Sequence, residues 1–286
     1  MEKVLVIGGT NIDYIGKSNN KIILEDSNIG VLKVSFGGVG RNIVENLARL
    51  GVDVTFISAV GKDILGLELR KELENLNVKV ISPEGDYKTG GYLAIHDDNG
   101  DMKLALCDQT SVDFVTIDYL ESLKELIQSF KCIVIDTNFN NNILTYLFET
   151  YKEKIIFVDA ISTEKGKHLL GLEQHINYLK CNKLEAETIF GKNYFDKFDE
   201  NTLIVTNGSK NVEYNKGEKI YYSDVEKVEA VNTIGAGDSF FSGFIFSIIN
   251  GMDEAEAIEI GKKVANITLL SDGAVNKELT KDKIIN

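Results

Sequence analysis

The stretch Asn232-Thr-Ile-Gly-Ala-Gly-Asp-Ser-Phe-Phe-Ser-Gly-Phe244 places two glycines and a carboxylate where a loop turns into an apolar helix. A glycine-rich helix start presents backbone N–H groups and the positive end of the helix dipole, which suits a phosphate or a developing oxyanion. Asp238 follows at once and can accept a proton from a substrate hydroxyl held against that cradle. An anion hole beside a base is the minimum that an enzyme needs to transfer a phosphoryl group from a nucleotide to an alcohol.

The same segment also has a purely structural interpretation. After a Gly-Ala-Gly turn, the Asp238 carboxylate can cap the first turn of the helix that follows. Nothing within residues 232–244 separates a capping role from a catalytic one. Both interpretations therefore stay open at this point, and the rest of the chain has to be considered.

Composition narrows the class of protein. The chain has 286 residues, 43% hydrophobic and 26% charged, which is typical of one large globular domain, and we expect a single domain over residues 1–286. The net charge of -13 argues against a nucleic-acid surface, which needs a basic stripe. Its few arginines (Arg41, Arg49, Arg70) disfavour a clamp for an already phosphorylated substrate. A neutral small-molecule substrate, with Mg²⁺ screening a nucleotide, suits this balance better.

Other features favour a cytoplasmic protein without a membrane partner. The cysteines are three, scattered and without metal-ligand spacing, so we expect reduced, buried thiols. The apolar run at the amino terminus is too short for a signal peptide. The longest apolar stretch, residues 240–249, is too short to span a bilayer.

Short β-rich runs alternate with helical patterns along the chain. The predicted buried strands are residues 4–8, 54–59, 132–136, 155–159, 178–181 and 203–206. The predicted helices are residues 40–50, 64–76, 116–130, 141–151 and 183–190, followed by two joined near Gly251 within 237–270. We expect residues 271–286 to form a polar surface ending. This alternation predicts a parallel sheet covered on both faces, with a site at the carboxyl edge of its strands.

Two segments depart from that alternation. Residues 13–36 and 89–107 carry alternating patterns with turn signals at 18–20 and 97–100, and we expect each to be an antiparallel hairpin. A small β-layer made from them would cover the cleft as a lid and exclude water. Its exposed surface also suits a homodimer contact. The alternative is that both hairpins are peripheral decoration.

Four further segments carry chemistry, although no P-loop is present. Gly37-Gly-Val-Gly-Arg-Asn42 lets a ligand approach the backbone, and Asn42 offers a donor and an acceptor to sugar hydroxyls. Gly8-Gly-Thr-Asn-Ile-Asp13 ends the first strand, where Asp13 can bind a ribose diol. Each segment is equally explained as a turn.

Asn182-Lys-Leu-Glu185 follows a predicted strand, and its Asn and Glu lie on one helix face. They can arrange water around Mg²⁺, or form a capping box, and the two roles are compatible. Thr206-Asn-Gly208 can place Thr206 and the Gly208 backbone near nucleotide phosphates, or form a hairpin turn. Asn266 can face an adenine.

Taken together, and in this order, these segments resemble the ribokinase-like (PfkB-type) carbohydrate kinases over the whole chain. Residues 37–42 resemble the family's amino-terminal signature, and 232–244 its carboxyl-terminal one, with Gly-Ala-Gly-Asp intact. The resemblance implies a three-layer α/β/α sandwich with a mainly parallel central sheet, a small β-sheet lid, and phosphoryl transfer from ATP with Mg²⁺. The implied roles are Asp238 as base; Gly235, Ala236 and Gly237 as anion hole; Asp13, Gly38 and Asn42 for the sugar; Asn182 and Glu185 for phosphate and Mg²⁺, with Glu185 at the metal; and Thr206, Gly208 and Asn266 for ATP.

Within that family, residues 35–51 and 159–165 are similar to pseudouridine kinases, which implies that the acceptor is the 5′-hydroxyl of pseudouridine. No role for Thr163 or Lys165 follows from the sequence. The alternatives are a ribokinase, fructokinase or other nucleoside kinase, and an inactive protein that binds a sugar or nucleoside. Many relatives carry Asp at the position of Asn232, where it helps to bind a monovalent cation, so this amide places potassium activation in doubt.

Overall fold

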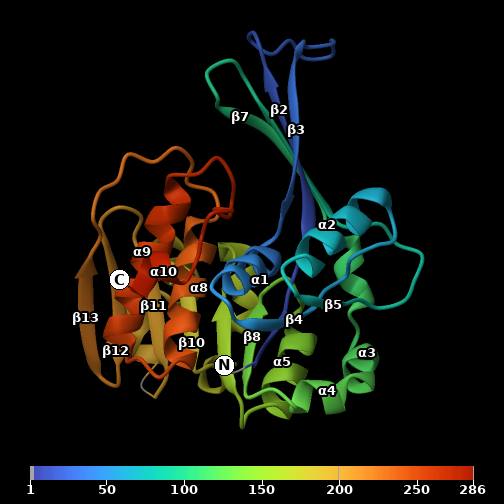
Figure 1. Ribbon diagram of the computed structural model, residues 1–286. Coiled ribbons are helices and arrows are strands. Elements are labelled where there is room, and N and C mark those ends of the chain that lie inside the picture. The colour runs from blue at the N-terminus through green and yellow to red at the C-terminus, as the bar shows by residue number, and fades with distance from the viewer. Residues whose placement is uncertain (1–2, 199, 286) are drawn as a thin grey trace.

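Two β-sheets organise the structure, a computed structural model that describes residues 3–198 and 200–285 (Figure 1). In these residues the large sheet has nine strands, in the order β13-β12-β11-β10-β9-β8-β1-β4-β5, and the small sheet has four, in the order β3-β2-β6-β7. Figure 1 shows the small sheet standing above one end of the body formed by the large sheet and its helices. A large sheet with a small second sheet is the arrangement that the resemblance implies.

The centre of the large sheet is parallel, as the strand–helix alternation predicts. Its parallel strands are β5 (Lys79–Ile81), β4 (Asp53–Ile57), β1 (Lys3–Ile7), β8 (Cys132–Asp136), β9 (Ile155–Asp159), β10 (Tyr178–Asn182) and β11 (Thr202–Thr206). Continuous Val- and Ile-rich runs form these strands because both faces of a parallel sheet are buried. The sequence predicts all of them except β5, which has only three residues.

An antiparallel hairpin, β12 (Asn211–Lys216) and β13 (Lys219–Asp224), completes one edge of the large sheet. A hairpin turn at 206–208 was one of the two interpretations of that segment, but the strands β12 and β13 were not predicted. Their residues are mostly polar and β13 is largely exposed, so the pair lacks the apolar run that identifies the central strands. The turn between β11 and β12 contains Asn207 and Gly208, and the hairpin interpretation of residues 206–208 is therefore correct.

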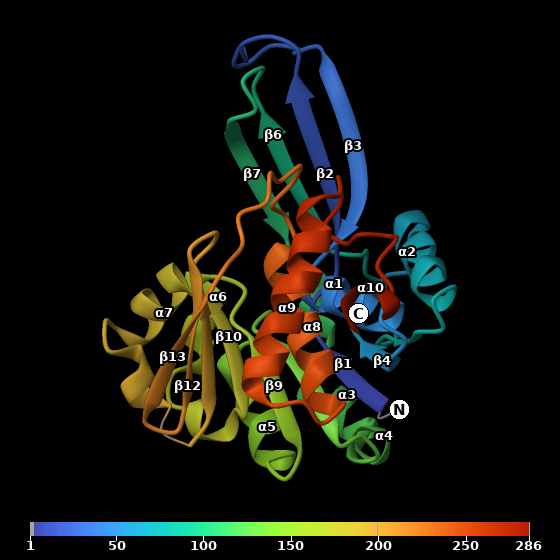
Figure 2. The same ribbon diagram turned by 60° about the vertical axis from the view of Figure 1, so that its left-hand side comes forward.

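Helices cover both faces of the large sheet, which confirms the three-layer α/β/α sandwich. Val4 and Val6 of β1 share one core with α1, α2, α8 and α9, whereas Leu5 and Ile7 share the opposite core with α3, α4, α5 and α7. The α-helices are α1 (Val39–Arg49), α2 (Ile64–Glu74), α3 (Ile117–Ser122), α4 (Lys124–Gln128), α5 (Asn141–Thr150), α6 (Thr163–Gly166), α7 (Lys183–Phe190), α8 (Ala236–Ile249), α9 (Glu254–Leu269) and α10 (Asp282–Ile285). Short 3₁₀ turns lie at Thr110–Phe114, Lys167–Leu169, Glu173–His175 and Tyr194–Lys197. In Figure 2, α8 and α9 run side by side on one face.

The small sheet consists of the two predicted hairpins. In one hairpin β2 (Asn11–Ser18) pairs antiparallel with β3 (Gly30–Gly37), and in the other β6 (Gly91–His96) pairs antiparallel with β7 (Met102–Asp108). Parallel pairing of β2 with β6 joins them (Figure 2). The turn predicted at 97–100 is present, because Asp97 N donates to Asp101 O. The first turn is much longer than predicted, since β3 begins only at Gly30.

Three expectations need correction. The helix predicted over 116–130 is divided at Leu123, whose backbone (φ -102°, ψ 8°) leaves the helical range between buried Leu120 and Ile127. Of the predicted surface ending at 271–286, residue 286 lies outside the described residues, and residues 271–285 are not purely a surface segment. Val275, Leu279 and Ile284 are buried, and the last two join the core that contains α1 and α8. Cys107 is exposed on β7, whereas the other two thiols are buried as predicted.

The carboxyl ends of the parallel strands lie along one edge of the large sheet. Asp136 at the end of β8 is in register with Asp159 at the end of β9, and Asn182 at the end of β10 with Thr206. Polar side chains thus gather at the edge where the α1 and α8 helices begin. No helix within residues 3–198 and 200–285 combines the length and apolar character that a bilayer-spanning helix requires.

Candidate active site

Asp238 lies in the first turn of α8 with 9% of its surface exposed. Its Oδ2 accepts a hydrogen bond from Nδ2 of Asn42, in the first turn of α1, at 2.8 Å. The residue that caps α8 is Gly235, and no side chain caps that helix. The capping interpretation of Asp238 is therefore wrong, and its carboxylate is engaged across the interface between two helices instead.

The turn before α8 has an unusual backbone. Gly235 adopts φ +75°, in the left-handed region that favours glycine. A Cβ atom at this position would also lie only 2.0 Å from the carbonyl oxygen of Ala274. These two constraints require glycine. Because no side chain caps α8, the first N–H groups of the helix have no side-chain partner, as an anion-binding cradle needs.

Asp13 and Gly38 lie at the turn that leads into α1, the helix whose Asn42 contacts Asp238. Gly38 adopts φ +98°, and any Cβ there would contact the backbone of Gly9 and Thr10 at 2.7 Å. The Asp13 carboxylate packs against Gly37, in the same turn, and accepts a hydrogen bond from the side chain of Asn11. Asp13 lies within β2 of the small sheet, as the hairpin predicted over 13–36 implies, and not in the turn directly after β1.

Asp136 joins these glycine segments, a role that the sequence analysis missed. Its buried Oδ2 accepts hydrogen bonds from the N–H groups of Gly9 at 2.8 Å and Gly40 at 2.9 Å. Burial raises the pKa of Asp136 above its ordinary value, and the hydrogen bonds oppose that shift. The signal available in the sequence was an acidic residue directly after a fully apolar strand.

The sequence analysis also did not identify the ion pair between Lys180 and Asp159. Lys180 lies within β10, is 7% exposed, and donates from Nζ to Asp159 Oδ2 at 3.0 Å. Although burial disfavours the charged form, the carboxylates of Asp159, Asp238 and Glu185 raise the pKa of Lys180. The signal in the sequence that could have revealed this pair is a lysine in the middle of an otherwise mostly apolar strand.

The electrostatics of the site raise the pKa of both central carboxyl groups. Burial, with a contribution from Asp159, raises the pKa of Asp238 to about 6, while Lys180 and the Asn42 hydrogen bond oppose the shift. Burial also raises the pKa of Asp13 to about 6, against the opposing charge of Arg41. A carboxylate with a pKa near that of a histidine can both accept and release a proton near neutral pH.

Asn182 and Glu185 form a capping box at the start of α7. Asn182 Oδ1 accepts from Glu185 N at 2.9 Å, and Glu185 Oε2 accepts from Asn182 N at 2.7 Å. Among the described residues no three His, Cys, Asp or Glu side chains gather to bind a metal directly. The second oxygen of Glu185 fits an Mg²⁺ that keeps several waters and takes its other ligands from phosphates. The pair is therefore compatible with both predicted roles.

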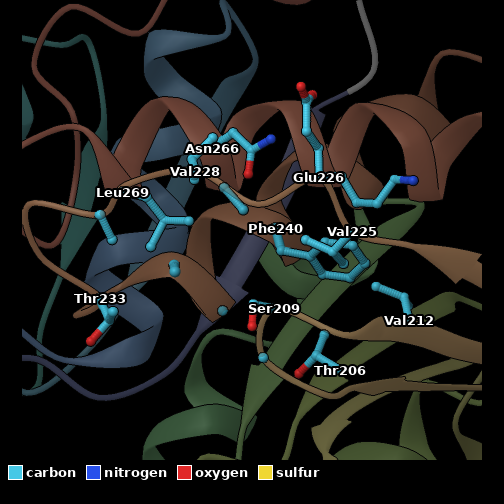
Figure 3. Close-up of a pocket in the computed structure, with 16 residues that line it drawn as sticks. Thr206, Ser209, Val212, Val225, Glu226, Val228, Thr233, Phe240, Asn266 and Leu269 are labelled. Carbon is cyan, nitrogen blue, oxygen red and sulfur yellow. The ribbon is translucent and has the colours of Figure 1, made fainter.

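A cavity of about 290 Å³ opens on the other side of the cradle (Figure 3). Predicted residues from three separate segments line it. They are Thr206 at the end of β11 with Gly208 just after it, Ala236 and Gly237 at the start of α8, and Asn266 on α9. Figure 3 shows Phe240, Val225 and Leu269 among the apolar side chains of its wall. Apolar walls with few polar groups suit a nucleotide base.

The sequence analysis also names Asn232, Thr163 and Lys165, and the structure shows their local contacts. Asn232 donates from Nδ2 to the carbonyl oxygen of Asp272 at 3.4 Å and accepts at Oδ1 from Ile234 N at 3.0 Å. Both ends of this amide are thus engaged in the loop before the cradle. Lys165 donates to Asn138 Oδ1 at 2.6 Å, and Thr163 begins α6 beside it.

Comparison with known proteins establishes the family. The sequence model of a family described as "pfkB family carbohydrate kinase" matches residues 1–281. The chain belongs to the pfkB family. This pfkB kinase is 31% identical to the pseudouridine kinase of Escherichia coli (strain K12), over 99% of this chain and 95% of that protein. It is 27% identical to the guanosine-inosine kinase of Exiguobacterium acetylicum, over 93% of each.

Solved structures agree with this assignment. A carbohydrate kinase from Agrobacterium tumefaciens superposes with a TM-score of 0.88 at 28% identity, covering 99% of this chain and 96% of that one. As a pfkB kinase, the protein is an ATP-dependent phosphotransferase that acts on a small sugar or nucleoside.

Proposed function

We propose that this pfkB kinase transfers the γ-phosphoryl group of ATP to the 5′-hydroxyl of pseudouridine. The observation that carries the phosphoryl transfer is the hydrogen bond of 2.8 Å between Asn42 and Asp238, which joins the acceptor segment to the phosphate cradle. The choice of acceptor is supported by 31% identity to a pseudouridine kinase over nearly the full length of both chains.

In this mechanism Asp238 takes the proton of the acceptor hydroxyl as that oxygen attacks the γ-phosphorus. The amides of Gly235, Ala236 and Gly237 stabilise the negative charge that develops on the transferred group. Asn42 holds the Asp238 carboxylate in place, and together with Asp13 and Gly38 it fixes the ribose in attacking geometry.

The donor nucleotide would occupy the cavity on the opposite side of the cradle. Thr206 and Gly208 would contact its phosphates, and Asn266 would face the adenine. Asn182 and Glu185 would hold the waters of Mg²⁺, which when bound neutralises phosphate charge. This division leaves the acceptor and donor on either side of Gly235–Gly237.

Other relatives are named for other acceptors, and these acceptors are the alternatives to pseudouridine. The guanosine-inosine kinase at 27% identity supports a purine nucleoside as the second candidate acceptor. The deciding experiment measures ADP release and product mass with pseudouridine, uridine, guanosine, inosine, adenosine, ribose and fructose at equal concentrations. We expect pseudouridine to give a kcat/KM at least about tenfold above every other acceptor, which corresponds to one or two correctly paired polar groups. A higher kcat/KM for any other acceptor would replace pseudouridine in the assignment.

The same panel separates a kinase from an inactive binding protein. ATP consumption that requires an acceptor, and is abolished in Asp238→Asn, supports catalysis. Acceptor binding by calorimetry without ATP consumption would instead identify a binding protein.

We also infer that two copies of the chain associate through the small sheet. Register places Tyr14, Leu32, Val34, Leu104 and Leu106 on one face of that sheet, and all five side chains are exposed. A contiguous apolar sheet face of this kind is unusual on a monomer, and a second copy of the same sheet would cover it by face-to-face packing.

A further inference from the structure

A buried ammonium group lies directly against the phosphate cradle. A Cβ atom placed on Gly237 would come within 2.9 Å of Lys180 Nζ and 3.4 Å of its Cε. The lysine head group therefore occupies the space beside the cradle that a side chain at residue 237 would need. Lys180 reaches this point from β10, the strand that ends at the proposed phosphate-binding residue Asn182.

The hydrogen bonding of Lys180 is incomplete within the protein. Among the described residues its Nζ donates to one acceptor, Asp159 Oδ2, although an ammonium has three donors. Burial of a charged group costs free energy, and the cost is offset only when its hydrogen-bonding capacity is filled. Two donors of this lysine, which is 7% exposed, have no acceptor among the described residues and are free to bind oxygens of a ligand held at the cradle.

We propose that Lys180 is a further catalytic residue, whose ammonium donates to an oxygen of the phosphoryl group during its transfer. The inference rests on the phosphoryl transfer proposed for the cradle of Gly235–Gly237, and it adds to that site a cation supplied by the protein itself. Asp159 holds the lysine in position from the end of the neighbouring strand β9.

The chemistry of the step gives this cation its function. The bond from the γ-phosphorus to the β,γ-bridging oxygen breaks, its electron pair stays on ADP, and the acceptor oxygen bonds to phosphorus. The hydroxyl proton moves to Asp238, while Lys180 stays protonated. Negative charge is spread over the peripheral oxygens of the transferred group, and a preorganised donor in a buried site stabilises it strongly.

A structural role for Lys180 makes a different prediction. If the lysine only neutralises the fully buried Asp159, then Lys180→Met harms the protein by leaving that carboxylate unpaired. The double variant Lys180→Met with Asp159→Asn removes both charges together, so it should recover stability. It should recover turnover only if Lys180 does not take part in the reaction.

The experiment compares the wild type, the single and double variants, and Lys183→Met as a matched control. Lys183 lies three residues later, is partly exposed, and pairs with Glu213 at 3.2 Å. We expect kcat to fall by about 10²–10³ in both Lys180 variants, as for loss of one oxyanion donor, with KM for the acceptor little changed. The control should keep wild-type kcat. A stable double variant with wild-type kcat would overturn the proposal.

A binding measurement tests the same point without turnover. ADP with aluminium fluoride and the acceptor mimics the transferring group, whereas ADP alone does not. The double variant should bind the fluoride complex far more weakly than the wild type and bind ADP equally well; equal affinity for both would also overturn the proposal. If the wild type transfers phosphate to no acceptor, the proposed function itself fails, whereas an active wild type with an equally active double variant rejects Lys180 alone.

Discussion

The side-chain amide of Asn42 donates to the carboxylate of Asp238 at 2.8 Å, across 196 positions of sequence. This contact joins the first turns of α1 and α8, one from each signature segment. It places a buried carboxylate at the junction of the two segments for which we propose acceptor binding and phosphate binding. The predictions that follow test this junction and its surroundings.

The Asp238 carboxylate is expected to be the general base. Asp238→Asn keeps the shape of the side chain but removes the proton acceptor, so kcat should fall by about 10²–10⁴. Nucleotide affinity measured by calorimetry should stay near the wild-type value. The matched control is Asp253→Asn, which changes the exposed carboxylate that caps the neighbouring helix α9. Wild-type kcat in Asp238→Asn would refute the assignment.

The pH profile should report the raised pKa of Asp238. Because the base must be deprotonated to act, kcat should fall as pH drops through about 6, the pKa of this carboxyl group. The Asn42 hydrogen bond favours the charged form, so Asn42→Ala should raise that pKa and move the acid limb to higher pH. An acid limb that stays in place, or moves to lower pH, would contradict this interpretation.

The cradle should depend on glycine at position 235. Gly235→Ala forces a Cβ against the Ala274 carbonyl oxygen and strains a left-handed backbone, so stability and kcat should both drop. Gly251→Ala is the matched control, because its φ is +83° but nothing lies within 4 Å of an added Cβ. We expect the control to lose only about 1–2 kcal/mol of unfolding free energy from the backbone conformation, with normal kcat. Equal effects in thermal unfolding and turnover would mean that the Ala274 contact is unimportant.

Activity should not require potassium. The Asn232 amide donates to the Asp272 carbonyl oxygen and carries no charge, so it gives little electrostatic reason to hold a monovalent cation there. Initial rates in potassium chloride and in tetramethylammonium chloride, at equal ionic strength, should agree. A strong and specific stimulation by potassium would show that a cation site exists despite the amide.

Self-association through the small sheet can be tested with two neighbouring residues on β3. Leu32 and Val31 are 81% and 65% exposed, but they point to opposite faces because successive strand residues alternate. Leu32→Lys should shift sedimentation toward the monomer, whereas Val31→Lys should not. An unchanged sedimentation profile for Leu32→Lys at micromolar concentration would exclude this face as the interface.

Sequence alone was sufficient for the elements whose signals are local. Val- and Ile-rich runs predict the central strands, because a strand buried on both faces needs apolar side chains at every position. The glycines of 37–42 and 235–237 predict close backbone turns, since only glycine tolerates φ +98° at Gly38 and +75° at Gly235. The order of these segments was enough to predict the family and its three-layer fold.

Tertiary structure alone decided which side chains meet. Asp136, Asp159 and Lys180 end or lie within different strands, and only the strand order and register bring them beside α1 and α8. The same is true of Asp13, which reaches the site from the small sheet, and of Leu279 and Ile284, which return to the core. Backbone conformation follows from neighbouring residues, whereas these contacts join residues from 21 to 196 positions apart, and no local pattern encodes them.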